Sequence, residues 1–172
     1  MFPSILLTGL WHSTSPERYD GIVETGAILP EPDLPETERW GSKMGKEHYP
    51  LVRALGGVSL FDFNDFEPEK YSKKFISSSW THFVPGRSSW PQTIWIKIDR
   101  SSIIENLITG NELLKIWNDS MYGHNLMPII ECAHIGKLPT KKFQEIFCYD
   151  SKSDKFIGQV GDRPRFHGVK GK

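Results

Sequence analysis

The residue whose surroundings most clearly suggest chemistry is Glu131, a carboxylate inside the apolar run 127–135. If that run is a β-strand, its side chains alternate between two faces. Glu131 then shares its face with apolar residues, namely Ile129, Ala133 and Ile135. A carboxylate on a core face is unfavourable unless a cation, several donors or a ligand uses it. This pattern is typical of functional acids, and a satisfied structural Glu at a sheet edge is the alternative.

A second candidate is His12, which follows an apolar run and precedes a predicted helix. The run 5–14 is predicted to be a strand that ends in small polar residues, Ser13 and Thr14. The next segment carries the start and stop signals of a helix: Ser15 as N-cap, Pro16 at the first helical position and Gly26 as stop. A side chain at such a junction is held firmly and still reaches a ligand, although a purely structural hydrogen-bonding role is the alternative.

Length and composition favour one soluble domain. The chain has 172 residues, of which 38% are hydrophobic and 12% aromatic, enough for a single core. Lys plus Arg and Asp plus Glu both total 21, so no global field indicates a nucleic-acid or membrane partner. Cys132 and Cys148 lie in apolar runs, as buried free thiols do, and a zinc site with His134 lacks a fourth ligand. Without a signal peptide or membrane-spanning run, a cytoplasmic location is expected.

The rest of the chain alternates short strands with irregular polar stretches. Strands are predicted at 56–63, 93–99 and 143–149, and the strict alternation of 93–99 is the clearest of these patterns. Asn111 is predicted to cap a helix. The loop 64–92 carries three aromatic residues, Trp80, Phe83 and Trp90, which argue against a merely solvated linker.

Two common catalytic motifs are absent from the sequence. The segment 57–61 lacks the second glycine of a nucleophile elbow, and no Gly-rich phosphate loop with Lys and Ser or Thr is present. Neither an acyl-transfer triad nor a nucleoside triphosphatase is therefore predicted.

The order of the remaining motifs resembles the ADP-ribosyltransferase-like fold over about residues 5–149. The His-Ser-Thr-Ser motif at 12–15, followed by a helix, is similar to the first motif of that family, and 57–61 to its second strand motif. Residues 96–104 resemble the central strand and turn of small members, including an anti-CRISPR ADP-ribosyltransferase. Residues 131–139 resemble the catalytic-Glu segment of DarT-like enzymes. The resemblance implies an α+β fold with a split antiparallel or mixed sheet and a few short helices, over 1–150. The remaining residues, 151–172, form a polar, basic tail by their composition, with Arg163, Arg165, His167, Lys170 and Lys172 near its end.

The resemblance also implies an activity. A member of this family cleaves the nicotinamide–ribose bond of NAD, as a consumed substrate, and transfers ADP-ribose to a macromolecular acceptor: DNA, RNA or protein. Glu131 would be the catalytic residue, stabilising the oxocarbenium-like centre and helping to deprotonate the acceptor. The implied NAD-binding residues are His12, Ser13, Thr14, Arg53, Ser59, Phe61 and Trp80, with Phe63 as a further choice for the ring that stacks on nicotinamide. For Arg53, a surface role is the alternative.

Two other functions remain open at this point. A catalytically silent binding module would use the basic tail, with Arg163 and Arg165 on phosphates and Trp80 or Trp90 stacking on bases. An NAD glycohydrolase would use the same site with water as acceptor. The setting, whether toxin, phage counter-defence or housekeeping, is equally open. For the tail itself, a frayed terminus is the expected structure.

Overall fold

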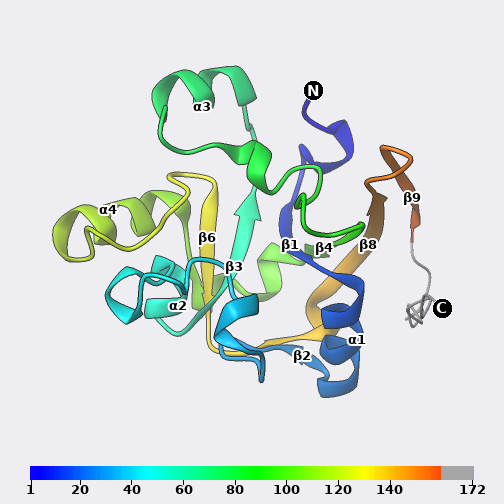
Figure 1. Ribbon diagram of the computed structural model, residues 1–172, viewed down its shortest axis with the longest axis horizontal. Coiled ribbons are helices and arrows are strands. Elements are labelled where there is room, and N and C mark those ends of the chain that lie inside the picture. Colours follow the sequence, from blue (N-terminus) through cyan, green and yellow to red (C-terminus); the bar gives the residue numbers. More distant parts are fainter. Residues whose placement is uncertain (160–172) are drawn as a thin grey trace.

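A seven-stranded antiparallel sheet dominates the computed structural model, which describes residues 1–159 (Figure 1). The strands lie side by side in the order β5-β6-β3-β1-β4-β8-β9. Their bounds are β1 (Leu10–Thr14), β3 (Gly57–Asp62), β4 (Gln92–Ile98), β5 (Leu107–Ile108), β6 (Glu131–Ile135), β8 (Phe143–Asp150) and β9 (Lys155–Gln159). A separate ladder joins β2 (Ala27–Ile28) to β7 (Leu138–Pro139). The predicted α+β class is confirmed.

The α-helices of the described part lie around this sheet. They are α1 (Pro16–Thr25), α2 (Leu51–Ala54), α3 (Pro68–Lys74) and α4 (Gly110–Ser120). Helix α1 packs beside β2 and β4, α2 against β3 and α4 against β6, whereas α3 lies beyond the end of β3 (Figure 1). Among the described residues no helix is both long and apolar enough to cross a membrane.

The two longer helices begin at side-chain caps. In α1 the Ser15 hydroxyl accepts a hydrogen bond from the Arg18 N–H, and Gly26 ends the helix with φ of 72°, which confirms the predicted bounds. The prediction that Asn111 caps α4 is wrong. Thr109 is the cap, because its hydroxyl and the Glu112 carboxylate form a reciprocal capping box that fixes the start two residues earlier.

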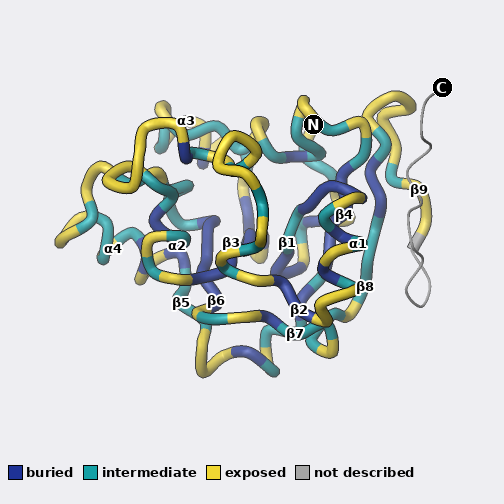
Figure 2. The backbone as a smooth tube through the Cα atoms, turned by 60° about the horizontal axis from the view of Figure 1, so that its bottom comes forward, coloured by how far each residue is buried: buried dark blue, intermediate teal, exposed yellow. Residues whose placement is uncertain are grey.

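The two faces of the sheet bury different side chains. Strand β4 alternates as predicted, with Ile94, Ile96 and Ile98 in an aliphatic core and Trp95 in an aromatic one. The aromatic core is built mainly from Trp11, Phe61, Phe63, Phe66, Tyr71, Trp95 and Tyr149. Figure 2 shows the buried backbone running through the central strands, with exposed segments in the loops around them.

Two predicted strands are shorter than expected. Residues 4–6 form a 3-10 helix instead of a strand, since this turn brings the Leu6 carbonyl to the indole N–H of Trp11, 3.0 Å away. Strand β6 begins at Glu131 itself. Pro128 has no N–H for a ladder and Ile129 has φ of 70°, so the segment before Glu131 turns. The expectation that Ile129 lies on the same strand face as Glu131 is therefore wrong.

Two segments predicted to be irregular contain regular structure. The loop 64–92 includes α3 and a 3-10 helix, Trp80–His82. Beyond residue 150, β9 pairs with β8 and extends the sheet into the predicted tail. The basic residues assigned to that tail, Arg163, Arg165, His167, Lys170 and Lys172, lie outside the described residues.

Candidate functional site

The sheet is interrupted at its centre, where β1 and β3 diverge. These strands pair at only two positions, Leu10 with Asp62 and Trp11 with Phe61. Beyond them, β1 stays paired with β4 as far as Thr14, and β3 stays paired with β6 back to Gly57. The His12 ring occupies the interruption, with Nδ1 2.9 Å from the Ser59 carbonyl oxygen. A side chain therefore joins the two strands where their backbone ladder stops.

Glu131 lies one strand further along, at the start of β6. Its side chain is 8% exposed and accepts two hydrogen bonds, from the Ser59 hydroxyl at 2.7 Å and from the Met127 N–H at 2.9 Å. Glu131 is paired with Phe61, so Ser59 is its diagonal neighbour on the same face. Burial raises the pKa of Glu131, and the two hydrogen bonds oppose that rise. The site thus holds an acid whose ionised form is fixed in place but poorly solvated.

His12 is held in its neutral form. Burial lowers its pKa, the positive charge of Arg18 lowers it further, and the hydrogen bond with Ser59 partly opposes both. A carbonyl oxygen only accepts, so Nδ1 carries the proton and donates it to Ser59. The other ring nitrogen, Nε2, is then an unprotonated acceptor, suited to a hydroxyl group of a ligand.

Ser59 connects the two candidate groups. Its hydroxyl donates to Glu131 and its carbonyl accepts from His12, so the positions of both depend on one residue of β3. Ser13 and Thr14 follow His12 along β1; Ser13 is half-buried and Thr14 is 3% exposed. The structure therefore joins Glu131 and His12 through Ser59, the first at its hydroxyl and the second at its carbonyl oxygen, with Ser13 adjacent to His12 in the chain.

Arg53 is used elsewhere. On α2 it forms ion pairs with Glu31 at 2.9 Å and Glu36 at 2.7 Å, and its guanidinium lies 3.8 Å from the ring centre of Tyr49. The hydrogen bond from Arg53 lowers the pKa of Glu36 to about 2. Among the described residues no hydrogen bond or ion pair joins Arg53 to Glu131. Its contacts hold the Pro-rich loop after β2 against α2.

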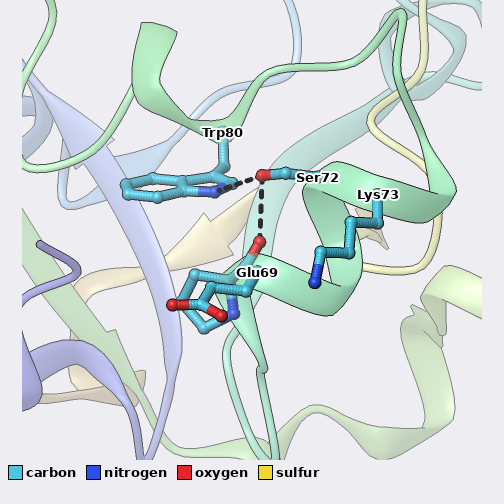
Figure 3. A pocket seen from close by; sticks show the side chains of 5 residues that line it. Glu69, Ser72, Lys73 and Trp80 are labelled. Atoms are coloured by element: carbon cyan, nitrogen blue, oxygen red, sulfur yellow. Dashed lines mark hydrogen bonds between the residues drawn. The ribbon is translucent and has the colours of Figure 1, made fainter.

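The aromatic candidates are also occupied. Phe61 is 6% exposed and stacks on Phe63 at 5.7 Å within the aromatic core. Trp80 packs on Phe2, and its indole N–H donates to the Ser72 hydroxyl at 3.2 Å. Figure 3 shows Trp80 against α3, over a shallow depression lined by Pro68, Glu69, Ser72 and Lys73. Phe61 is therefore buried away from a ligand, whereas Trp80 is half-buried and itself lines the depression.

Tyr71, which is not among the residues predicted from sequence, lies near enough to Glu131 to feel its charge. Tyr71 of α3 is 6% exposed, with its hydroxyl 3.0 Å from that of Ser78. Burial raises the pKa of Tyr71 to about 12, and the negative charge of Glu131 adds to the rise. Pro68 and the spacing of Tyr71 and Phe75 were helix signals inside the presumed loop.

Comparison with known proteins leaves the site to be interpreted on its own geometry. No protein-family model matches the chain, and no curated protein is significantly similar to it. In the part that the structure describes, no group of three or more His, Cys, Asp or Glu side chains is arranged to hold a metal ion. Cys132 and Cys148 are both buried and free.

Removing the charge of Glu131 should stabilise the protein at neutral pH. Because the pKa of Glu131 is raised in the folded state, the unfolded chain releases this proton at a lower pH than the folded one. Stability is therefore lost as the pH rises from about 4.5 through the folded-state pKa, and the loss is constant above it. We expect Glu131→Gln to have a higher Tm than wild type at pH 7.5 and a similar Tm at pH 4.

Differential scanning calorimetry at the two pH values measures this difference. In a domain of this size, each kcal/mol of change in the free energy of unfolding shifts Tm by roughly 2–4 °C. The matched control is Glu24→Gln, at an exposed position of α1, which should leave Tm unchanged at both pH values. A Glu131→Gln protein less stable than wild type at pH 7.5 would show that Glu131 is an ordinary structural acid.

Proposed function

We propose that this chain is an NAD-dependent mono-ADP-ribosyltransferase with Glu131 as its catalytic residue. The observation that supports this most is a buried carboxylate joined through Ser59 to a neutral His12, at the point where β1 and β3 diverge. His12 and Glu131, both named by the motif resemblance, are 119 positions apart in the sequence, and both bond to Ser59. NAD is a substrate here, and its ADP-ribose goes to a macromolecular acceptor.

The proposed reaction needs a fixed anion beside a developing cation. The C–N bond between nicotinamide and ribose breaks, and its electron pair leaves with nicotinamide, which neutralises the charge of the pyridinium ring. The ribose C1′ becomes oxocarbenium-like, and the Glu131 carboxylate stabilises it. A lone pair of the acceptor then forms the new bond to C1′, and its proton passes to Glu131. Ser59 and the Met127 N–H keep the carboxylate oriented throughout.

His12 has a binding role in this scheme. Its Nε2 accepts a hydrogen bond from a hydroxyl of the second ribose, and its Nδ1–H is held by Ser59. Because the ring is neutral, it adds no repulsion to the cationic transition state. Ser13 supplies a half-buried hydroxyl one residue further along β1.

His12→Ala should weaken NAD binding more than it slows turnover of bound NAD. The change removes one hydrogen bond to the substrate, which corresponds to about a tenfold loss of affinity. Isothermal titration with NAD and single-turnover nicotinamide release separate the two effects. The control is His82→Ala, at an exposed residue of the 3-10 helix Trp80–His82, which should bind NAD normally. Unchanged affinity in His12→Ala would remove His12 from the binding site.

The test of the proposed function is nicotinamide release from NAD by the wild-type chain, with and without cell lysate as a source of acceptors. Release that lysate stimulates supports transfer to a macromolecule. Release that is independent of lysate indicates NAD hydrolysis. No release under either condition, together with salt-sensitive binding of an oligonucleotide, would replace the proposal with a binding module.

A further inference from the structure

Among residues 1–159, Arg87 meets no acidic partner of the kind that a partly buried cation normally has. Its guanidinium is half-buried against three aromatic rings, with its central carbon 4.6 Å from the ring centre of Trp90, 5.0 Å from that of Trp40 and 5.9 Å from that of Phe83. No side chain within residues 1–159 forms a hydrogen bond or ion pair with it. Cation–π attraction to the three rings offsets part of the free-energy cost of removing the guanidinium from water. A partly buried charge without a neighbouring anion is still unfavourable.

A second arginine lies over one of the same rings. The Arg18 guanidinium is 5.6 Å from the ring centre of Trp90 and donates to the Glu38 carbonyl at 2.7 Å. It also lies 3.9 Å from the exposed Glu38 carboxylate, which is a weak surface pair. Burial lowers the pKa of Arg87, and the charge of Arg18 adds to that effect. Two like charges therefore face the same tryptophan with little compensation.

This arrangement is built by local structure and not by chance contact of long side chains. The backbone N–H of Trp90 donates to the backbone carbonyl of Arg87 at 2.9 Å. This tight turn places the Trp90 ring beside the Arg87 guanidinium. Trp40 packs edge-on against Phe83 at 5.1 Å and brings in the loop after β2. Arg18 is fixed by the first turn of α1, where its N–H is bonded to the cap Ser15. Three separate segments converge on one cationic, aromatic patch.

The patch adjoins the candidate site. Phe83 lies 5.5 Å from Phe61, the residue paired with Glu131 across the β3–β6 ladder. Arg18 follows His12 by six residues, and its charge acts on the His12 ring. The patch therefore contacts the strand residue beside Glu131 through Phe83 and reaches the surroundings of His12 through the charge of Arg18.

We infer that Arg18, Arg87 and Trp90 form a binding site for the phosphate or diphosphate group of a nucleotide. Guanidinium groups match phosphate oxygens in bidentate geometry, and Trp40 or Trp90 offers a ring for the attached base. The inference rests on the proposed function only for the source of the phosphate: if NAD is the substrate, its diphosphate occupies this site. A nucleic-acid strand is the other source of the same group.

Binding of ADP-ribose tests the site without any need for turnover. Titrations followed by tryptophan fluorescence compare wild type, Arg87→Gln, Arg87→Lys and the control Lys141→Gln, an exposed lysine of the 140–142 turn. We expect Arg87→Gln to bind ADP-ribose about tenfold or more weakly, Arg87→Lys to fall between it and wild type, and Lys141→Gln to match wild type. Adenosine, which has no phosphate, should bind all four proteins equally weakly. The Arg87→Gln protein should also be at least as stable as wild type, since an uncompensated cation is removed.

A single-stranded oligonucleotide in place of ADP-ribose distinguishes the two sources. Arg87-dependent binding of ADP-ribose supports the site and identifies the dinucleotide as its source. Arg87-dependent binding of the oligonucleotide alone supports the site with a polymer as its source. Equal binding of both probes by wild type and Arg87→Gln, or no binding of either probe by wild type, overturns the inference. Nicotinamide release is scored separately, so Arg87-dependent ADP-ribose binding without release would leave the phosphate site standing and the proposed activity refuted.

Discussion

Replacing Glu131 by Gln should slow nicotinamide release by about a hundredfold or more while leaving most of the NAD affinity in place. The amide keeps the size of the side chain and one acceptor for Ser59 or Met127, so the local geometry is retained. What is lost is the negative charge, which interacts with the substrate mainly once C1′ becomes cationic. In a poorly solvated position such a charge acts through a low effective dielectric and is worth more than at the surface.

The measurement is single-turnover release of nicotinamide, with NAD affinity determined separately by calorimetry. Ser59→Ala provides a graded comparison, because it removes one of the two donors that orient the carboxylate and leaves its charge. We expect its rate to fall between those of wild type and Glu131→Gln. Glu24→Gln, at an exposed position on α1, serves as the unaffected control. Near-normal turnover by Glu131→Gln would show that the assignment of Glu131 is wrong.

The raised pKa of Glu131 links this prediction to stability. The same substitution that removes catalysis should increase Tm at neutral pH, because folding forces an acid into surroundings that disfavour its charge. A group retained for packing alone would show the opposite, with loss of both activity and stability on substitution. The two measurements on one variant therefore distinguish a functional acid from a structural one.

Local signals made the parts of the site predictable from sequence. Glu131 was identified because a carboxylate interrupts an apolar run, and His12 because it precedes a well-marked helix start. Both signals depend only on near neighbours in the chain. Strand alternation holds from Glu131 onward, where β6 begins. The residues before it, including Pro128 and Ile129, form a turn, which near-neighbour patterns do not reveal.

Contacts between residues far apart in the sequence determine the features that the sequence alone does not predict. Arg53 was a candidate ligand for NAD, yet its acidic partners Glu31 and Glu36 lie in a Pro-rich loop whose position depends on α2. Arg87 is the converse case. Nothing in the sequence near it indicates that a partly buried guanidinium would meet rings from two loops and, within residues 1–159, no acid. Interruption of the β1–β3 ladder is likewise a property of four strands together, because β1 stays paired with β4 and β3 with β6.

Gly110→Ala should destabilise the fold strongly and disturb the site at the same time. Gly110 is the first residue of α4, and a Cβ there would lie 1.7 Å from the carbonyl oxygen of Ile129 and 2.3 Å from its carbon. Both atoms are backbone, so no side-chain rotation relieves the clash. Ile129 already has φ of 70°, in the left-handed region that β-branched residues disfavour, which leaves the turn little freedom to move. We expect the free energy of unfolding to fall by about 3 kcal/mol or more, at the upper end of what overpacking costs.

Thermal unfolding measures the effect, which corresponds to a fall in Tm of roughly 6–12 °C for a domain of this size. The same turn carries the Met127 N–H that holds Glu131, so nicotinamide release per folded molecule should fall as well. Gly21→Ala is the matched control: it lies exposed within α1, its added Cβ meets nothing within 4 Å, and helix propensity favours Ala by about 0.5–1 kcal/mol. The two identical substitutions should thus shift Tm in opposite directions. If Gly110→Ala keeps wild-type stability and activity, the turn before Glu131 is free to move, and the carboxylate is not held as rigidly as the proposed mechanism needs.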